Sequence, residues 1–207
     1  MKLTIVSGGT TSPSSTRLLA DRITESLTKQ LGDAGGEEPE VRVVELRDVA
    51  VDIAKNMVTG FPSPALQAEL DAVTGADGVI AVTPVYSASY SGLFKSFFDV
   101  IDAGALTGTP VLIGATGGTP RHSLALDHAL RPLLSYLRAT VMPTGVYAAS
   151  QDWGGEDASE LHARIDRAAG ELAGAMTGAP RSRRASDGFS DFVPFEQQLA
   201  SLGQLDV

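Results

Sequence analysis

Short apolar runs alternate with amphipathic segments along most of this chain. Five runs read as strands, because they are brief, rich in branched apolar residues and bounded by Gly, Pro or polar residues. Between them, apolar residues recur at helical spacing, most clearly at Leu19, Ile23, Leu27 and Leu31. The predicted strands cover residues 3–6, 41–46, 78–83, 111–115 and 141–148. The predicted helices cover residues 16–31, 63–73, 92–102, about 121–138 and 157–176.

Regular alternation of strands and helices is typical of a parallel sheet covered by helices on both faces. We therefore predict an α/β domain over residues 1–178. Residues 179–207 differ in composition, because a polar linker is followed by an amphipathic stretch in which Phe195, Leu199 and Leu202 share a helical face. We expect this tail to pack on its own domain or on a neighbouring subunit. Gating of the site or docking of a partner protein are the alternatives.

Composition excludes several classes of function. The 207 residues include no Cys and only three widely spaced His, so disulfides are impossible and we predict no metal site. The formal net charge of -9 disfavours a nucleic-acid binder, which needs a basic face. The apolar run at the start of the chain is too short for the core of a signal peptide, and no apolar stretch is long enough to span a membrane. We expect a cytoplasmic protein.

Three loops at the carboxyl ends of predicted strands carry the candidate chemistry, because ligands of open parallel sheets bind at that edge. The first, SGGTTSPSST at residues 7–16, opens a helix with abundant hydroxyls and exposed N–H groups, which suits a phosphate monoester. It matches neither the Walker A loop nor the GxGxxG dinucleotide motif. A plain turn with an N-cap would use only one or two of the hydroxyl and N–H groups of this loop, so their excess favours a bound ligand.

The second and third loops suit a planar ligand. Residues 83–92 (TPVYSASYSG) combine a rigid Pro with Tyr86 and Tyr90 among small residues, although an ordinary surface loop with two Tyr is the alternative. Residues 116–119 (TGGT) place consecutive glycines where a ligand edge can approach the main chain.

These motifs carry a family resemblance. The first loop, TPVYSASYSGLFKSFFD at residues 83–99 and ATGGTPRHSLALDHALRPLLSYL at residues 115–137 resemble the NADPH-dependent FMN reductases. The likeness includes the reductases of two-component alkanesulfonate systems, which hand reduced FMN to a separate flavin-dependent monooxygenase. It implies a flavodoxin-like three-layer sandwich with a five-stranded parallel sheet in the order 2-1-3-4-5. It also implies FMN and NADPH as cofactors, and a homodimer or homotetramer.

The resemblance also implies roles for individual residues. The FMN phosphate would lie at the first loop, the isoalloxazine ring at the second, and the other edge of the ring at the third. Where the family has an Arg in the first loop, this chain has Thr11 or a neighbour, which leaves Arg17 or Arg121 to supply positive charge. The predicted cofactor-binding residues are Gly9, Thr11, Ser14, Ser15, Thr16, Pro84, Val85, Tyr86, Ser87, Thr116, Gly117, Gly118 and Arg121.

One helix departs from the relatives. Where the alkanesulfonate reductases have a Tyr at a π-bulge in the tetramer interface, this chain has His128, which we interpret as a packed interface residue, with a catalytic role as the alternative. Pro132 lacks a main-chain N–H and therefore predicts a kink or bulge nearby. Lys95 and Asp99 are four residues apart on one helix face, which predicts an ion pair or a subunit contact.

The predicted mechanism is hydride transfer between two stacked cofactors, which depends on positioning more than on acid–base side chains. We therefore assign no catalytic side chain, and predict an FMN reductase that supplies a flavin-dependent monooxygenase. Two alternatives remain: a quinone or azo-compound reductase with permanently bound FMN, and a flavodoxin-like electron carrier that does not react with pyridine nucleotide.

Overall fold

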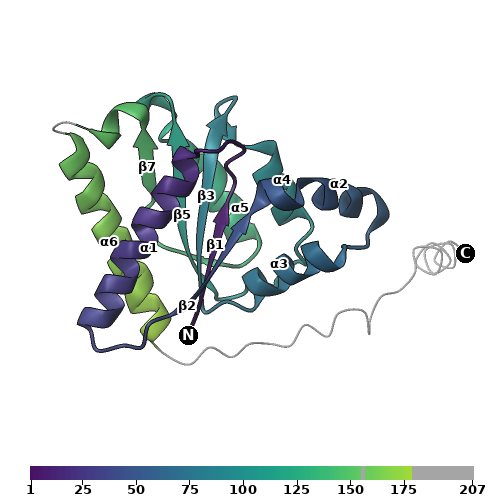
Figure 1. The fold of residues 1–207 in the computed structure, drawn as a ribbon, viewed down its shortest axis with the longest axis horizontal. Coiled ribbons are helices and arrows are strands. Elements are labelled where there is room, and N and C mark those ends of the chain that lie inside the picture. The colour runs from purple at the N-terminus through teal and green to yellow at the C-terminus, as the bar shows by residue number, and fades with distance from the viewer. Residues whose placement is uncertain (155–156, 179–207) are drawn as a thin grey trace, which may run out of the picture.

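A central parallel sheet with helices on both faces forms the body of the molecule (Figure 1). The computed structural model describes residues 1–154 and 157–178. The strands are β1 (Lys2–Ser7), β2 (Glu40–Glu45), β3 (Gly78–Tyr86), β4 (Ser89–Tyr90), β5 (Pro110–Gly117), β6 (Thr140–Val141) and β7 (Val146–Ala149). The order is β2-β1-β3-β5-β6, and β7 also pairs with β5. Counting β6 and β7 as one interrupted strand, this is the predicted flavodoxin-like order 2-1-3-4-5, so the fold prediction is confirmed.

Each central strand contributes to two cores, because successive side chains of a strand point to opposite faces of the sheet. Ile80 packs with one cluster and its neighbour Val79 with the other. Helices α1 (Ser15–Asp33) and α6 (Asp157–Thr177) cover the first face, and Figure 1 shows them side by side. The opposite face is covered by α2 (Ala50–Thr59), α3 (Pro64–Thr74), α4 (Gly92–Asp99) and α5 (Arg131–Tyr136).

Helix α1 forms as the sequence predicts. Its stripe of Leu19, Ile23, Leu27 and Leu31 is fully buried, and each such side chain contributes about 1.5–3 kcal/mol. The Ser14 side chain accepts a hydrogen bond from the main-chain N–H of Arg17, which caps the helix. The cap fixes where the helix begins, directly after the first loop.

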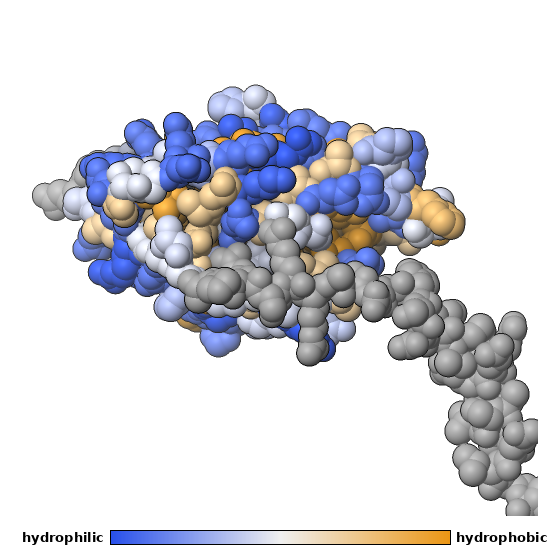
Figure 2. Space-filling view, turned by 90° about the horizontal axis from the view of Figure 1, so that it is seen from below, coloured by the Kyte–Doolittle hydropathy of each residue, from blue (hydrophilic) through white to orange (hydrophobic). Residues whose placement is uncertain are grey.

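Helix α2 was not predicted. A short 3₁₀ helix, Leu46–Val49, leads into it from β2, and no side chain caps it. Its apolar residues do not form one clean stripe, because some of them face solvent. Figure 2 shows hydrophilic and hydrophobic surface side by side on one face, with a hydrophobic patch at the right-hand end, where α2 and the following turn lie in Figure 1. The exposed apolar residues of this region are Val51, Met57, Val58 and Phe61.

The predicted helix over residues 121–138 is not continuous. It consists of a 3₁₀ turn (Pro120–His122), a π-helical turn (Leu126–Leu130) and α5. The N–H of Arg131 bonds to the carbonyl of Leu126, five residues earlier, immediately before Pro132. The bulge predicted from Pro132 is therefore confirmed, and His128 lies within it. The predicted helix over 92–102 also ends earlier, at Asp99.

The last predicted strand, residues 141–148, is interrupted between β6 and β7. Pro143 lies in the gap and has no N–H to donate to a neighbouring strand. Arg131 donates to the carbonyls of Met142 and Pro143 at 2.8 and 3.0 Å. The Thr144 N–H donates to the Glu171 carboxylate at 2.8 Å. Side chains from α5 and α6 thus take the place of a strand partner.

Two further expectations concern the limits of the domain. The predicted boundary at residue 178 and the tail over 179–207, with its amphipathic stretch, lie outside the described residues and remain predictions. Within the described residues, no helix combines the length and apolarity needed to cross a membrane.

Candidate functional site

The three predicted loops meet at the carboxyl edge of the sheet around a hollow of about 210 Å³. Every predicted binding residue except Ser87 and Arg121 lines it. Those residues are Gly9, Thr11, Ser14, Ser15, Thr16, Pro84, Val85, Tyr86, Thr116, Gly117 and Gly118. Thr10 and Ser150 line it as well and were not predicted. Ser150 follows the last strand, so the rule about carboxyl ends could have indicated it.

The first loop is shaped by its own hydroxyls. A Cβ on Gly9 would lie 2.2 Å from the Ser14 Oγ, so any other residue would displace the helix cap. The Thr11 hydroxyl donates to the carbonyl of Pro13 at 3.0 Å. The loop leads into a helix of 19 residues, whose first N–H groups have no partners within the helix. This arrangement can receive an anion.

The third loop is held by Tyr147 from β7. The Tyr147 hydroxyl donates to the carbonyl of Thr119 at 2.7 Å, and a Cβ on Gly117 would lie 2.1 Å from the same oxygen. Burial, and then the negative charge of Asp152, raise the pKa of Tyr147, so the phenol keeps its proton at neutral pH. By contrast, a Cβ on Gly118 would meet nothing within 4 Å. The glycine at 118 faces open space.

One buried hydrogen bond joins the first loop to the third. Thr16 and Thr116 share a hydrogen bond of 2.9 Å between their hydroxyls, and both residues are buried. The start of α1 and the end of β5 are therefore held together beneath the hollow.

The second loop is a tight hairpin that presents Tyr86. Strand β3 continues past its predicted end to Tyr86 and pairs antiparallel with β4. Ser87 and Ala88 form the turn with φ of 50° and 69°, a left-handed conformation that costs about 1 kcal/mol or more per residue. The Tyr86 hydroxyl lies 3.0 Å from the Thr10 hydroxyl, linking the second loop to the first across the hollow. Ser87 lies at the turn, which explains why it is outside the lining.

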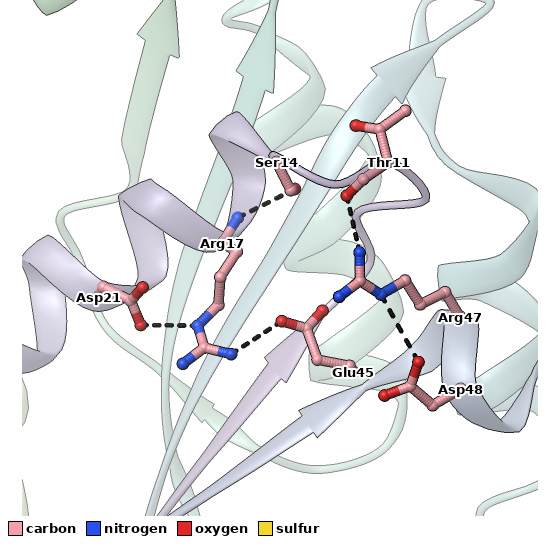
Figure 3. A network of polar contacts seen from close by, with 7 residues as sticks. All are labelled: Thr11, Ser14, Arg17, Asp21, Glu45, Arg47 and Asp48. Carbon is pink, nitrogen blue, oxygen red and sulfur yellow. Dashed lines mark hydrogen bonds and ion pairs between the residues drawn. The ribbon is translucent and has the colours of Figure 1, made fainter.

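Neither Arg predicted to supply positive charge lies in the lining. Arg17 bonds to Asp21 at 2.7 Å and to Glu45 at 2.8 Å, and these hydrogen bonds, that of Asp21 first, raise its pKa (Figure 3). Arg121 lies in the exposed 3₁₀ turn after the third loop. A different cation reaches the first loop, because Arg47 donates to the main-chain carbonyl of Thr11 at 2.8 Å. Nothing in the sequence near the loop indicated Arg47.

The lining offers few groups for proton transfer. Tyr86 is its one ionisable side chain within the part of the chain that the structure describes. The same part contains no group of three or more Asp, Glu or His side chains suited to a metal. The predicted ion pair of Lys95 and Asp99 is present on α4, away from this lining. The hollow can therefore bind and orient a ligand through main chain, hydroxyls and one aromatic ring.

These features fit a flavin mononucleotide. Hydroxyls and a helix start suit its phosphate, and Pro84, Val85 and Tyr86 suit a flat ring. The bare main chain at Gly118 leaves room for the edge of such a ring.

Known proteins resemble this chain in sequence and in fold. The family described as NADPH-dependent FMN reductase matches residues 1–154. An FMN reductase (NADPH) from Pseudomonas aeruginosa is 45% identical over 152 residues, which cover 73% of this chain and 78% of the relative. The NADH-dependent FMN reductase SfnF of Pseudomonas fluorescens is 41% identical, covering 86% and 92%. The solved structure of an oxidoreductase from Corynebacterium diphtheriae is 48% identical with a TM-score of 0.82, covering 84% and 96%.

The matched region contains all three loops and every strand of the sheet. The resemblance seen in the motifs is thus confirmed, and FMN and NAD(P)H are the cofactors. The chain belongs to the NADPH-dependent FMN reductase family, and it is an NAD(P)H:FMN oxidoreductase.

Proposed function

We propose that this enzyme binds FMN in the hollow at the carboxyl edge as an exchanging substrate, and supplies reduced FMN to a partner flavin-dependent monooxygenase. The observation that carries the proposal is the lining of the hollow. Three loops converge there, and Tyr86 is the one ionisable side chain among the lining residues that the structure describes. Such a site is built to position cofactors. The resemblance of the long motifs to reductases of two-component systems supports the partner.

Each loop has a role in this proposal. The first loop, with Gly9, Thr11 and residues 14–16, would hold the phosphate through N–H groups and hydroxyls. Pro84, Val85 and Tyr86 would support the ring, and residues 116–118 would flank its other edge. Contacts from Ser87 and Arg121 stay predictions, since both lie outside the lining.

The chemistry of the step comes from the cofactors. Bound FMN supplies N5 as the acceptor of a hydride from NAD(P)H. The protein contributes proximity and orientation, which are worth several kcal/mol of barrier in well-aligned reactions. The left-handed turn at Ser87 and Ala88 fixes Tyr86, and the hydrogen bond between Tyr86 and Thr10 holds that ring against the first loop. No side chain of the lining is required to move a proton.

A direct assay tests the proposal. The purified protein is mixed with NADPH or NADH, with and without added FMN, and oxidation is followed at the nicotinamide absorption band. Oxidation that requires added FMN, with little flavin retained after gel filtration, supports an exchanging substrate. Flavin retained through gel filtration with fast quinone turnover would instead identify a quinone reductase. Flavin binding without nucleotide oxidation would identify an electron carrier.

Supply to a partner is tested separately. A flavin-dependent monooxygenase is assayed with the reductase as its source of reduced FMN, and free photoreduced FMN serves as the control. We expect turnover to depend on the reductase and on NAD(P)H. The relatives are named for NADPH in one case and NADH in another, so the KM of both nucleotides is measured.

The cysteine-free sequence supports a reducing, cytoplasmic setting.

We also propose that the enzyme is a homodimer or homotetramer. A groove of about 650 Å³ runs between α4 and the π-helical turn with α5, and it includes His128. Tyr136 on its rim is 79% exposed, which leaves a large aromatic ring available for a subunit contact. Light scattering of the full chain gives the mass. A monomer at micromolar concentration would contradict this proposal.

A further inference from the structure

A phosphate bound at the first loop needs positive charge that the loop does not carry. Residues 7–16 contain no Lys, Arg or His, and the chain has a formal net charge of -9. A phosphate monoester brings up to two negative charges to this position. N–H groups and hydroxyls provide hydrogen bonds but only partial charges. A nearby guanidinium would therefore strengthen binding.

Arg17, the Arg that directly follows the loop in the sequence, already forms two ion pairs. Arg17 points along α1 to Asp21 and across to Glu45, as Figure 3 shows. The Glu45 side chain is only 12% exposed, and its Oε2 has no hydrogen-bond partner within the described residues. The region beside the loop thus holds negative charge that Arg17 offsets only in part.

Arg47 reaches the loop from a different element. Strands β1 and β2 are parallel with Ser7 opposite Glu45, so the residues after Glu45 lie beside the loop that follows Ser7. Arg47 is in the 3₁₀ helix that leaves β2, and its guanidinium donates to the carbonyl of Thr11 at 2.8 Å (Figure 3). Its pairing with Asp48 is looser, at 3.5 Å, with Asp48 largely exposed. The tighter contact is therefore with the loop.

We propose that Arg47 is a positioning residue for the FMN phosphate, holding the first loop through Thr11 and supplying the charge that the loop lacks. The proposal rests on the proposed function, because it takes the phosphate to lie at this loop. The hydrogen bond orients the peptide between Thr11 and Ser12, and Thr11 lines the hollow. The guanidinium remains about one-third exposed, so it can act on a ligand by its charge without being displaced.

The experiment compares FMN with riboflavin, which lacks the phosphate. Dissociation constants for both flavins are measured by fluorescence quenching for the wild type, Arg47→Ala and Arg47→Lys. Arg42→Ala is the matched control, because Arg42 lies on β2 but pairs with Glu69 away from the loop. We expect Arg47→Ala to weaken FMN binding about tenfold, the loss typical of a hydrogen bond plus a nearby charge. Riboflavin binding should not change, and the loss should also appear as a higher KM for FMN.

The variants separate charge from geometry. Arg47→Lys keeps the charge and should retain part of the FMN affinity, while Arg42→Ala should match the wild type. Arg47→Ala binding FMN as the wild type does, or losing FMN and riboflavin equally, would overturn the proposal. An increase confined to the KM of NADPH, with NADH unaffected, would overturn it too, because it would assign Arg47 to the nucleotide's 2′-phosphate. If the wild type binds riboflavin as tightly as FMN, the phosphate assignment of the proposed function fails first.

Discussion

The first and third loops of the site both contain two consecutive glycines, but the glycines serve different purposes. Gly9 and Gly117 are required by the protein itself, because a Cβ would collide with the hydroxyl of Ser14 or Tyr147. Gly118 is not, since nothing lies within 4 Å of its Cβ position. Where no protein atom fills the space beside a glycine, a ligand can approach its main chain. We therefore propose that Gly117 serves the packing of the fold and its neighbour Gly118 the approach of the ligand.

The strongest test of this comparison is Gly117→Ala. The new Cβ would lie 2.1 Å from the hydroxyl oxygen of Tyr147. Tyr147 is only 7% exposed as a residue, so its ring cannot move far. We expect the free energy of unfolding to fall by about 3 kcal/mol, from overpacking and the loss of the hydrogen bond to Thr119. Urea denaturation measures it. Adding Tyr147→Phe removes the clashing oxygen and should recover stability; a double variant no better than the single one would contradict the explanation.

Next in size is the bond that joins the two loops. Thr16→Val leaves the buried hydroxyl of Thr116 without its partner, which should cost about 1–2 kcal/mol of unfolding free energy. The double variant Thr16→Val with Thr116→Val removes both polar groups and should cost less than the two single changes added together. Additive losses would show that the two hydroxyls do not depend on each other.

Gly118→Ala should separate stability from binding. Because the Cβ enters open space and Gly118 has no positive φ, the free energy of unfolding should change by less than about 0.5 kcal/mol. We expect the dissociation constant of FMN to rise several-fold. Unchanged FMN affinity would show that the ring does not approach the main chain at this position.

The smallest expected effect is a pH dependence of stability that comes from the phenol proton of Tyr147. Burial and the charge of Asp152 raise its pKa in the folded protein above the unfolded value of 10.0. The resulting stability is fully present below pH 10 and is lost as pH rises through the folded pKa. The difference in unfolding free energy between the wild type and Tyr147→Phe should therefore be constant from pH 7 to pH 9 and shrink above pH 10. A difference that grows above pH 10 would contradict the assigned cause.

Most of the fold could be read from the pattern of apolar residues. The central strands β1, β3 and β5 are covered on both faces, so their apolar runs are continuous and easy to recognise. Helix α2 was missed because some of its apolar residues face solvent and its start has no capping side chain. The interruption near Pro143 could not be placed, because Arg131 and Glu171, which satisfy its main chain, come from other elements.

The site followed the same rule. Its loops were predicted because parallel strands end at one edge, and their motifs contain every lining residue except Ser150. The sequence did not indicate Arg47, the cation that contacts the first loop in the structure, and the role of Arg121 stays a prediction. Arg17 is near the loop in the sequence, but its spacing of four from Asp21 already favours an ion pair along the helix. Arg47 lies beside the loop only because β2 runs parallel to β1, a relation that one-dimensional spacing does not contain.

The interrupted strand at β6 and β7 also has a consequence for how copies of this enzyme can meet. An uninterrupted outer strand offers a row of free N–H and carbonyl groups, to which the strand of another molecule can add. Here Pro143 has no N–H, and Arg131 and Glu171 already occupy groups of Met142, Pro143 and Thr144. A foreign strand would find no regular ladder there. This margin of the sheet is therefore protected against edge-to-edge aggregation, whereas the opposite margin is formed by β2, a continuous strand that pairs with β1.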